Sequence, residues 1–308
     1  MKPRNIRDRL LHRRVRAFEK ALPEASGGDV SAVHKARVAS RRVREALPIV
    51  LADLPAKKAK RLARGFRRIT RALGPVREMD VALRVLDTTV ARFPEAAASL
   101  QTVARDLTAE REVRLEEMLG RLEHADPERM VAKLGAAADL GSAQPPVVAQ
   151  SVSRAVLAVR VVRRVRRLQQ VVADAGALYA AEPLHSVRIA AKKLRYALEL
   201  AHELRLLRSR RPIRQLESMQ DTLGQLHDLQ VLADRLTAAQ AVLVASAPAA
   251  AADLSRVRSA LDDDCRRLHA EYAAARDSLL AAVDSALDAV TAAPPRDVET
   301  EPVSTSVH

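Results

Sequence analysis

The chain has 308 residues with 52 Lys and Arg against 38 Asp and Glu, which gives a formal net charge of +14. Hydrophobic residues make up 48%, which allows a sizeable core and excludes a disordered chain. The single cysteine, Cys265, excludes an internal disulfide framework and a cysteine-cluster zinc site, and an aromatic content of 2% disfavours base stacking with single-stranded nucleic acid.

Apolar residues recur with helical periodicity along most of the chain, and no alternating pattern predicts a strand of useful length. Pro23, Pro55 and Pro94 fall between the predicted helices, and Asp29 and Ser31 lie where a helix cap is expected. In the first half, helices are predicted over 4–22, 31–53, 56–73, 77–91, 96–123 and 128–139. In the second half, they are predicted over 147–179, 184–207, 210–240 and 248–291. The pattern predicts an all-α protein built of helix bundles.

The chain is predicted to form one domain over residues 1–291. A stretch rich in Pro, Gly and Ser at 139–146 separates two helical parts, 4–139 and 147–291, and a polar, proline-containing tail at 292–308 is predicted to be disordered. No run of about 18 apolar residues predicts a membrane span. The charged N-terminus lacks the pattern of a secretory signal, so the expected compartment is the cytoplasm.

An internal repeat is the most specific signal in the sequence. Residues 33–47 (VHKARVASRRVREAL) recur as 184–198 (LHSVRIAAKKLRYAL), and residues 73–81 (LGPVREMDV) recur as 223–231 (LGQLHDLQV). The two motifs occur in the same order at offsets of 151 and 150 residues. They indicate a duplicated unit of the size of one domain or half-domain.

The positive charge is concentrated in the first part of each repeat. Residues 1–77 hold 22 Lys and Arg against 6 Asp and Glu, and residues 154–214 hold 15 against 4, so the rest of the chain is acidic. A surface adapted only for solubility mixes both signs. The segregation predicts a positive region shared by the two halves, with an affinity for polyanions.

On a helix, the basic residues of the repeated motif form a stripe about 80° wide. The first stripe contains His34, Arg37, Arg41 and Arg44, and the second contains His185, Arg188, Lys192 and Arg195. An apolar stripe runs beside each. Like charges stacked in this way destabilise a free helix by about 0.2–0.5 kcal/mol per pair, so an anion or acidic residues must neutralise them. Arg offers a planar fork suited to phosphate oxygens, and His contributes as a neutral donor or as a cation.

The duplicated His-x-x-Arg helix, followed in each half by Leu-Gly-x-x-(Arg/His)-(Asp/Glu), resembles the CHAD domain, the conserved histidine α-helical domain, over residues 4–290. The resemblance implies an all-α fold of two four-helix bundles related by a pseudo-twofold axis, with a basic central groove or pore. It also implies binding of inorganic polyphosphate and association with polyphosphate granules. Glu78 stands where the family more usually has Asp.

Carried over to this chain, the binding positions are His34, Arg37, Arg41, Arg42, Arg44, His185, Arg188, Lys192, Lys193 and Arg195. His227 falls at the second-copy Leu-Gly-x-x-His-Asp position, and Arg77 takes the corresponding place in the first copy. Further basic residues are predicted to line the same surface: Arg13, Arg64, Arg67 and Arg71.

Other functions are less favoured by the residues. Neither repeat histidine has a second His or a carboxylate at i+3 or i+4, so no metal, cofactor or catalytic residue is predicted. Glu78, Asp80 and Asp228 are interpreted as acidic partners that orient basic side chains, rather than as a general base or Mg²⁺ ligands. A helical nucleic-acid-binding protein, a phosphoanhydride-acting enzyme and a granule scaffold stay open as alternatives. The oligomeric state and the purpose of binding are not predicted.

Overall fold

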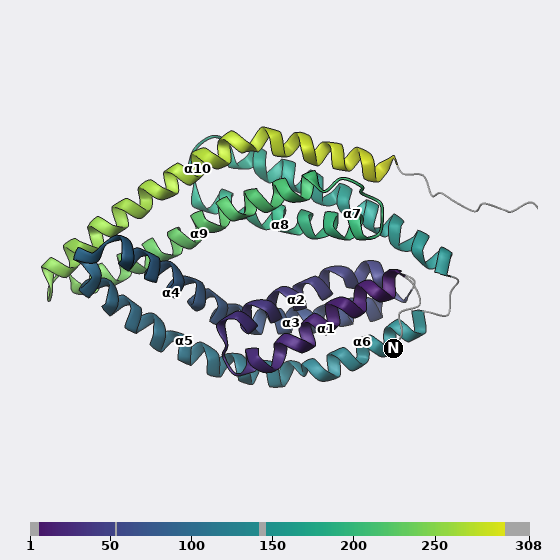
Figure 1. Ribbon diagram of the computed structural model, residues 1–308, viewed down its shortest axis with the longest axis horizontal. Coiled ribbons are helices and arrows are strands. Elements are labelled where there is room, and N and C mark those ends of the chain that lie inside the picture. The colour runs from purple at the N-terminus through teal and green to yellow at the C-terminus, as the bar shows by residue number, and fades with distance from the viewer. Residues whose placement is uncertain (1–5, 53, 142–145, 293–308) are drawn as a thin grey trace, which may run out of the picture.

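The computed structural model describes residues 6–52, 54–141 and 146–292. These residues are almost entirely α-helical and include no strand, which confirms the predicted fold class (Figure 1). The first half comprises α1 (Ile6–Ser26), α2 (Val30–Val50), α3 (Ala56–Ala72), α4 (Gly74–Arg92), the 3-10 turn η1 (Pro94–Ala96), α5 (Ala97–Ala125) and α6 (Pro127–Gly141). The second half comprises α7 (Pro146–Ala175), α8 (Ala181–Glu203), α9 (Arg211–Leu243) and α10 (Pro248–Thr291).

The helix boundaries agree closely with those predicted, with one clear exception. Pro23 lies inside α1 rather than after it, and the helix continues to Ser26. The last turn survives because its backbone bond from the Gly27 N–H to the Pro23 carbonyl, at 3.2 Å, needs no donor from the proline. Gly28, with φ of 81°, then ends the turn, and the Asp29 carboxylate accepts from the Ala32 N–H at 2.7 Å as the predicted cap.

The second half consists of four long helices. The first half has helical segments in the same order, but two of these segments are each divided into two helices. The segment matching α9 is divided into α3 and α4 at Leu73, and the segment matching α10 is divided into α5 and α6 at Asp126, which has φ of 48°. Gly224, by contrast, lies within the continuous helix α9. A glycine at this position of the motif therefore does not by itself break a helix. The middle of the predicted hinge, 142–145, and nearly all of the tail, 293–308, lie outside the described residues.

Two apolar cores hold the halves together. The larger contains buried residues of α1–α6 from the first half and of α7–α10 from the second. The smaller is shared between the hairpin of α4 and α5 and the hairpin of α9 and α10, with Leu86 and Leu100 packed in the same cluster as Leu236 and Leu254. Figure 1 shows these four helices converging at the left of the molecule. This shared core brings α4 beside α9.

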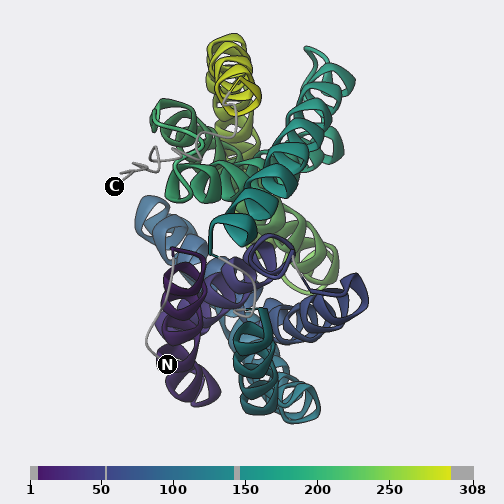
Figure 2. The same ribbon diagram turned by 90° about the vertical axis from the view of Figure 1, so that its right-hand side faces the viewer.

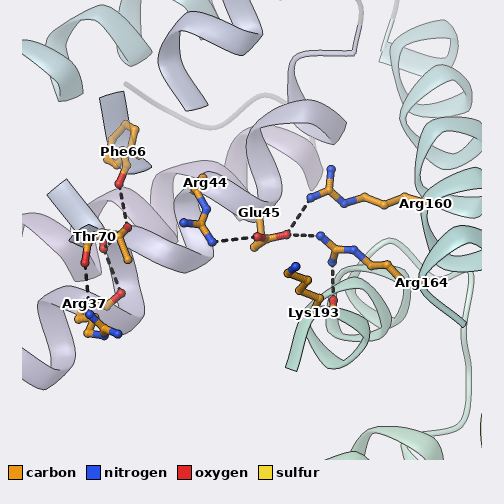
Figure 3. Close-up of polar contacts among 9 residues, drawn as sticks. Arg37, Arg44, Glu45, Phe66, Thr70, Arg160, Arg164 and Lys193 are labelled. Carbon is orange, nitrogen blue, oxygen red and sulfur yellow. Dashed lines mark hydrogen bonds and ion pairs between the residues drawn. The ribbon is translucent and has the colours of Figure 1, made fainter. Parts of the chain in front are cut away.

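A buried carboxylate also ties the halves. Glu45 of α2 accepts from the Nη2 of Arg160 on α7 at 2.7 Å and from Arg164 one turn further on, and Arg44 donates to its other oxygen at 3.2 Å (Figure 3). Burial alone would raise the pKa of Glu45, but Arg164 and Arg160 lower it to about 2. Ser153 of α7 donates to a carbonyl of α2 as well. These contacts fix α2, which carries the first basic stripe, against the second half.

None of the described helices combines the length and the apolar character that a membrane crossing requires.

Candidate anion-binding site

Basic side chains of α2, α4 and α8 converge where the two halves meet. We define the central cation cluster as Arg37 and Arg41 of α2, Arg77 and Arg84 of α4, and Arg188 and Lys192 of α8. The charges act on one another across the halves: Arg188 lowers the pKa of Arg37, and Arg41 lowers the pKa of both Arg188 and Lys192. The two stripes therefore face each other.

Arg37 is held at the junction of α3 and α4. Its Nη1 donates to the carbonyl of Thr70, in the last turn of α3, at 3.4 Å, where the negative end of the helix dipole favours a cation (Figure 3). The Thr70 hydroxyl lies 3.0 Å from the Ser40 hydroxyl and donates to the carbonyl of Phe66, which links α2 to α3. A Cβ at Gly74 would lie 2.6 Å from Nη1 of Arg37, so only glycine leaves room for this guanidinium.

Arg188 occupies the corresponding place in the second half. A Cβ at Gly224 would lie 4.0 Å from its Nε, an ordinary van der Waals contact. One turn after Gly224 on α9, the ring of His227 lies against the ring of His185 on α8, tilted by 48° with centroids 4.8 Å apart. The two glycines of the repeated Leu-Gly motif thus lie beside the two equivalent arginines of the repeated His-x-x-Arg motif.

Lys192 is a strongly perturbed member of the cluster. Burial lowers its pKa to about 7, from an ordinary value of 10.5, and neighbouring guanidinium groups act in the same direction. They belong to Arg188, Arg41, Arg37 and Arg195. No carboxylate is among the main charges that act on Lys192, so its charged form is unfavourable in the free site and an anion would relieve this.

His227 and His34 are neutral at neutral pH. Burial lowers the pKa of His227 to about 4, with further lowering by Arg188, His185 and Lys192. Partial burial of the His34 ring and the charges of arginines on α2 and α4 also lower the pKa of His34. Its side chain keeps an exposed part of its surface at the start of the stripe. Neutral imidazoles still offer one N–H donor each, so the part of these residues as phosphate contacts stays a prediction.

One carboxylate is placed among the cations from the second half. Asp228 of α9 opposes the lowering of the Arg188 pKa and also acts on Arg77, which belongs to the first half. Burial raises the pKa of Asp228, while Arg188, Arg84 and Arg77 lower it. Asp228 therefore fits its interpretation as an acidic partner of basic side chains.

Asp80 and Glu78 are also acidic partners. Asp80 is buried and accepts from Nε of Arg111 at 2.7 Å. Burial mainly lowers the pKa of Arg37, and Glu78 opposes that lowering.

Arg84 was missed by sequence reasoning. It lies two helical turns after Arg77 on α4, so the i, i+7 spacing was the available signal. It also lines a cavity of about 420 Å³ between α4 and α9, together with Gly224 and Asp228. This cavity adjoins the central cation cluster.

Several predicted site residues lie away from the cluster. Arg44 is engaged with Glu45, Arg13 pairs with Glu203 at 2.9 Å, and Arg42 lies 3.8 Å from Glu199. Arg195 acts on Lys192 but also lies 3.6 Å from Glu199. The remaining residues are exposed, and none is among the main charges that shift a pKa in the cluster: Arg64, Arg67, Arg71 and Lys193. Their part in binding stays a prediction.

Within residues 6–52, 54–141 and 146–292, no group of three or more His, Cys, Asp or Glu side chains is arranged to hold a metal ion.

The fold and the site define an all-α protein with a cationic centre built from two helical halves. A family model described as the CHAD domain matches residues 9–237, so the chain belongs to the CHAD domain family, as the repeated motifs predicted.

Two solved structures share the fold. The CHAD domain from the plant Ricinus communis has a TM-score of 0.53 and 24% identity, covering 90% of this chain and 89% of that one. PptA from Streptomyces chartreusis has a TM-score of 0.62 and 18% identity, covering 86% and 96%. No curated protein matches the chain.

Proposed function

We propose that the protein binds inorganic polyphosphate at the central cation cluster and does not chemically alter it. The observation that carries the proposal is the convergence of Arg37 and Arg41 with Arg188 and Lys192, from opposite halves, in a partly buried place. Placing these cations together is costly in the free protein, and a ligand with closely spaced negative charges would remove the cost. Membership of the CHAD family, which is associated with polyphosphate, supports the same ligand.

The form of the site favours a phosphate chain over nucleic acid. A polyphosphate carries a charge on each phosphate and no bases, so it needs only arginine forks and point charges. Nucleic-acid sites usually add groups that contact the bases, either aromatic platforms or a helix that reads a groove. The 2% aromatic content disfavours the first of these. Each charge-assisted contact would contribute about 1.5–3 kcal/mol before ordering costs.

In the cell, such a module would place the protein in the cytoplasm at polyphosphate granules. Binding in the absence of turnover fits a role in targeting to granules or in organising them.

Fluorescence anisotropy with labelled long-chain polyphosphate tests the ligand. The complex is formed at physiological salt and challenged with unlabelled polyphosphate, single-stranded RNA or duplex DNA at equal phosphate concentration. We expect only polyphosphate to displace the label efficiently. Equal displacement by RNA or DNA would show a generic cationic surface and would overturn the proposal.

A separate assay tests the absence of catalysis. The protein is incubated with polyphosphate and Mg²⁺, and release of orthophosphate is followed over time. We expect no release above that of the boiled protein. Release that depends on protein concentration and is lost in a variant of Arg37 and Arg188 would show a phosphoanhydride-cleaving enzyme instead.

A further inference from the structure

A second concentration of arginines lies at the opposite end of α8 from His185, about 28 Å away along the helix. There a cavity of about 610 Å³ is formed by α7, the loop 204–210, the start of α9 and the last turns of α10. Figure 2 views the molecule from the end at which α10 finishes. The volume lies in the range of small-molecule sites.

The rim of this cavity is cationic. Arg154, Arg205, Arg208 and Arg211 line it, and no Asp or Glu is among the described residues that do so. None of the four arginines forms an ion pair with a carboxylate of the described part of the chain. Arg154 is held in place by the carbonyls of Leu204 and Arg205, to which its Nε and Nη2 donate at 3.3 and 3.4 Å. The rim therefore presents positive charge without a local counterion.

The backbone at Arg205 gives an independent indication. Arg205 follows Leu204, the C-cap residue of α8, with φ of 59°, in the left-handed region that such a position usually fills with glycine. The turn is closed by bonds from Arg205 N to the His202 carbonyl and from Leu206 N to the Ala201 carbonyl, at 3.1 and 2.8 Å. Glycine would make the same turn with less strain. The turn places Arg205 on the lining of the cavity.

The floor of the cavity is apolar. Leu206, Leu207 and Pro212 are buried beneath the rim, and α10 contributes small side chains at Ala282 and Ala286. Serine hydroxyls complete the lining at Ser209, Ser278 and Ser285. A polyphosphate, charged along its whole length, is a poor match for such a floor, because burying its charges there would leave them unpaired. A nucleotide is a poor match too, since no described lining side chain is aromatic.

We infer that this cavity binds an aliphatic anion, with a phosphate or carboxylate head held by Arg208 and Arg211 and a hydrocarbon body lying on the alanine face of α10. A docked helix would need a longer apolar stripe than the residues between Ala281 and Ala289 provide, so a small ligand fits the cavity better than a partner protein. This site is separate from the central cation cluster and does not depend on polyphosphate binding there.

The test uses the full chain and the fluorescent anion anilinonaphthalene sulfonate as a probe. Three competitors are compared: decyl phosphate, tripolyphosphate as a head without a tail, and decyl maltoside as a tail without a charge. We expect displacement by decyl phosphate alone, and decanoate in a parallel titration distinguishes a carboxylate from a phosphate head. Equal displacement by tripolyphosphate or by decyl maltoside would overturn the inference.

Variants locate the site. Arg208→Glu with Arg211→Glu should weaken decyl phosphate binding roughly tenfold or more, as expected for losing at least one charge-assisted contact. Arg256→Glu with Arg266→Glu makes the same charge change at exposed positions of α10 and should leave binding intact. If circular dichroism shows that the Arg208 and Arg211 variant does not fold, Ala281→Leu with Ala289→Leu is used instead. These substitutions fill the cavity from exposed positions and should also reduce binding. Unchanged affinity in a folded cavity variant would contradict the inference.

Discussion

The guanidinium of Arg37 lies so close to Gly74 that a Cβ at Gly74 would be 2.6 Å from Nη1, whereas a Cβ at Gly224 would be 4.0 Å from Nε of Arg188. The repeated Leu-Gly motif thus provides space for the repeated arginine. A Cβ at the glycine is accommodated in the second half and not in the first. The glycine and the arginine are far apart in sequence and meet only because α2 packs against the junction of α3 and α4.

Gly74→Ala should weaken polyphosphate binding by several-fold, because the added methyl group must push the Arg37 guanidinium out of its place beside Thr70. The helix itself should tolerate the change, since alanine has a higher helix propensity than glycine by about 1 kcal/mol. Affinity is measured by anisotropy and stability by thermal unfolding. Gly224→Ala is the matched control, and equal loss of affinity in both variants would contradict the contact-based account.

Polyphosphate affinity should decrease as the pH rises above about 7, the pKa of Lys192. A bound polyanion favours the charged amine, so binding above this pH requires uptake of a proton. Calorimetric titrations in buffers of different ionisation enthalpy measure that proton directly. Lys192→Arg should remove the proton uptake, because arginine stays charged throughout. Identical proton uptake in the variant would assign it to another group.

Protein stability should show the opposite trend in the same range. The folded pKa of Lys192 is lower than its ordinary value of 10.5, so the unfolded chain binds more protons between about 7 and 10.5. Lys192 therefore disfavours folding at low pH, and its unfavourable contribution fades as the pH rises through this window. Comparing urea unfolding of the wild type and Lys192→Met at both ends of the window isolates this contribution.

Asp228→Asn should tighten polyphosphate binding by a few-fold. The carboxylate of Asp228 partly neutralises Arg188 and Arg77, so it competes with the ligand for the same cations. The amide removes the charge with little change in shape. Weaker binding would instead mean that Asp228 acts mainly by orienting those arginines, and the measured sign of the change decides between the two roles.

Glu45→Gln should destabilise the protein by about 3 kcal/mol, because removing one partner from a buried ion pair leaves its arginines uncompensated. The folded pKa of Glu45 is about 2 against an ordinary 4.5, so its stabilising contribution is present above about 4.5 and is lost as the pH falls towards 2. Urea unfolding measures both effects. Asp263→Asn, whose pair with Arg266 is exposed, should cost less than about 1 kcal/mol.

The helices and the two basic stripes could be predicted because periodicity and repeated motifs are local properties of the sequence, whereas the way in which the stripes face each other could not. The stripe geometry also grouped Arg44 with Arg41, yet the two differ in the structure. Arg44 points to Glu45, which is buried between the halves, and no local pattern shows that α7 will bring Arg160 to the same carboxylate. Long-range packing decided the role of this residue.

The proximity of Arg84 and Asp228 also depends on long-range packing. Arg84 follows Arg77 at i+7 and Asp228 belongs to the repeated Leu-Gly motif, but these local patterns do not show that the two residues come together, which happens because α4 packs against α9 through the shared apolar core. The apolar faces of the two hairpins were visible in the sequence, but nothing in them specified that the hairpins would pack on each other.

The most direct test of the central claim is the affinity of Arg37→Gln with Arg188→Gln for polyphosphate. This pair removes one cation from each half while keeping polar side chains of similar length, and circular dichroism verifies the fold. We expect binding to be lost at physiological salt, with Arg105→Gln and Arg256→Gln, both exposed and outside the cluster, binding as the wild type does. A folded Arg37 and Arg188 variant that binds polyphosphate with wild-type affinity would contradict the account.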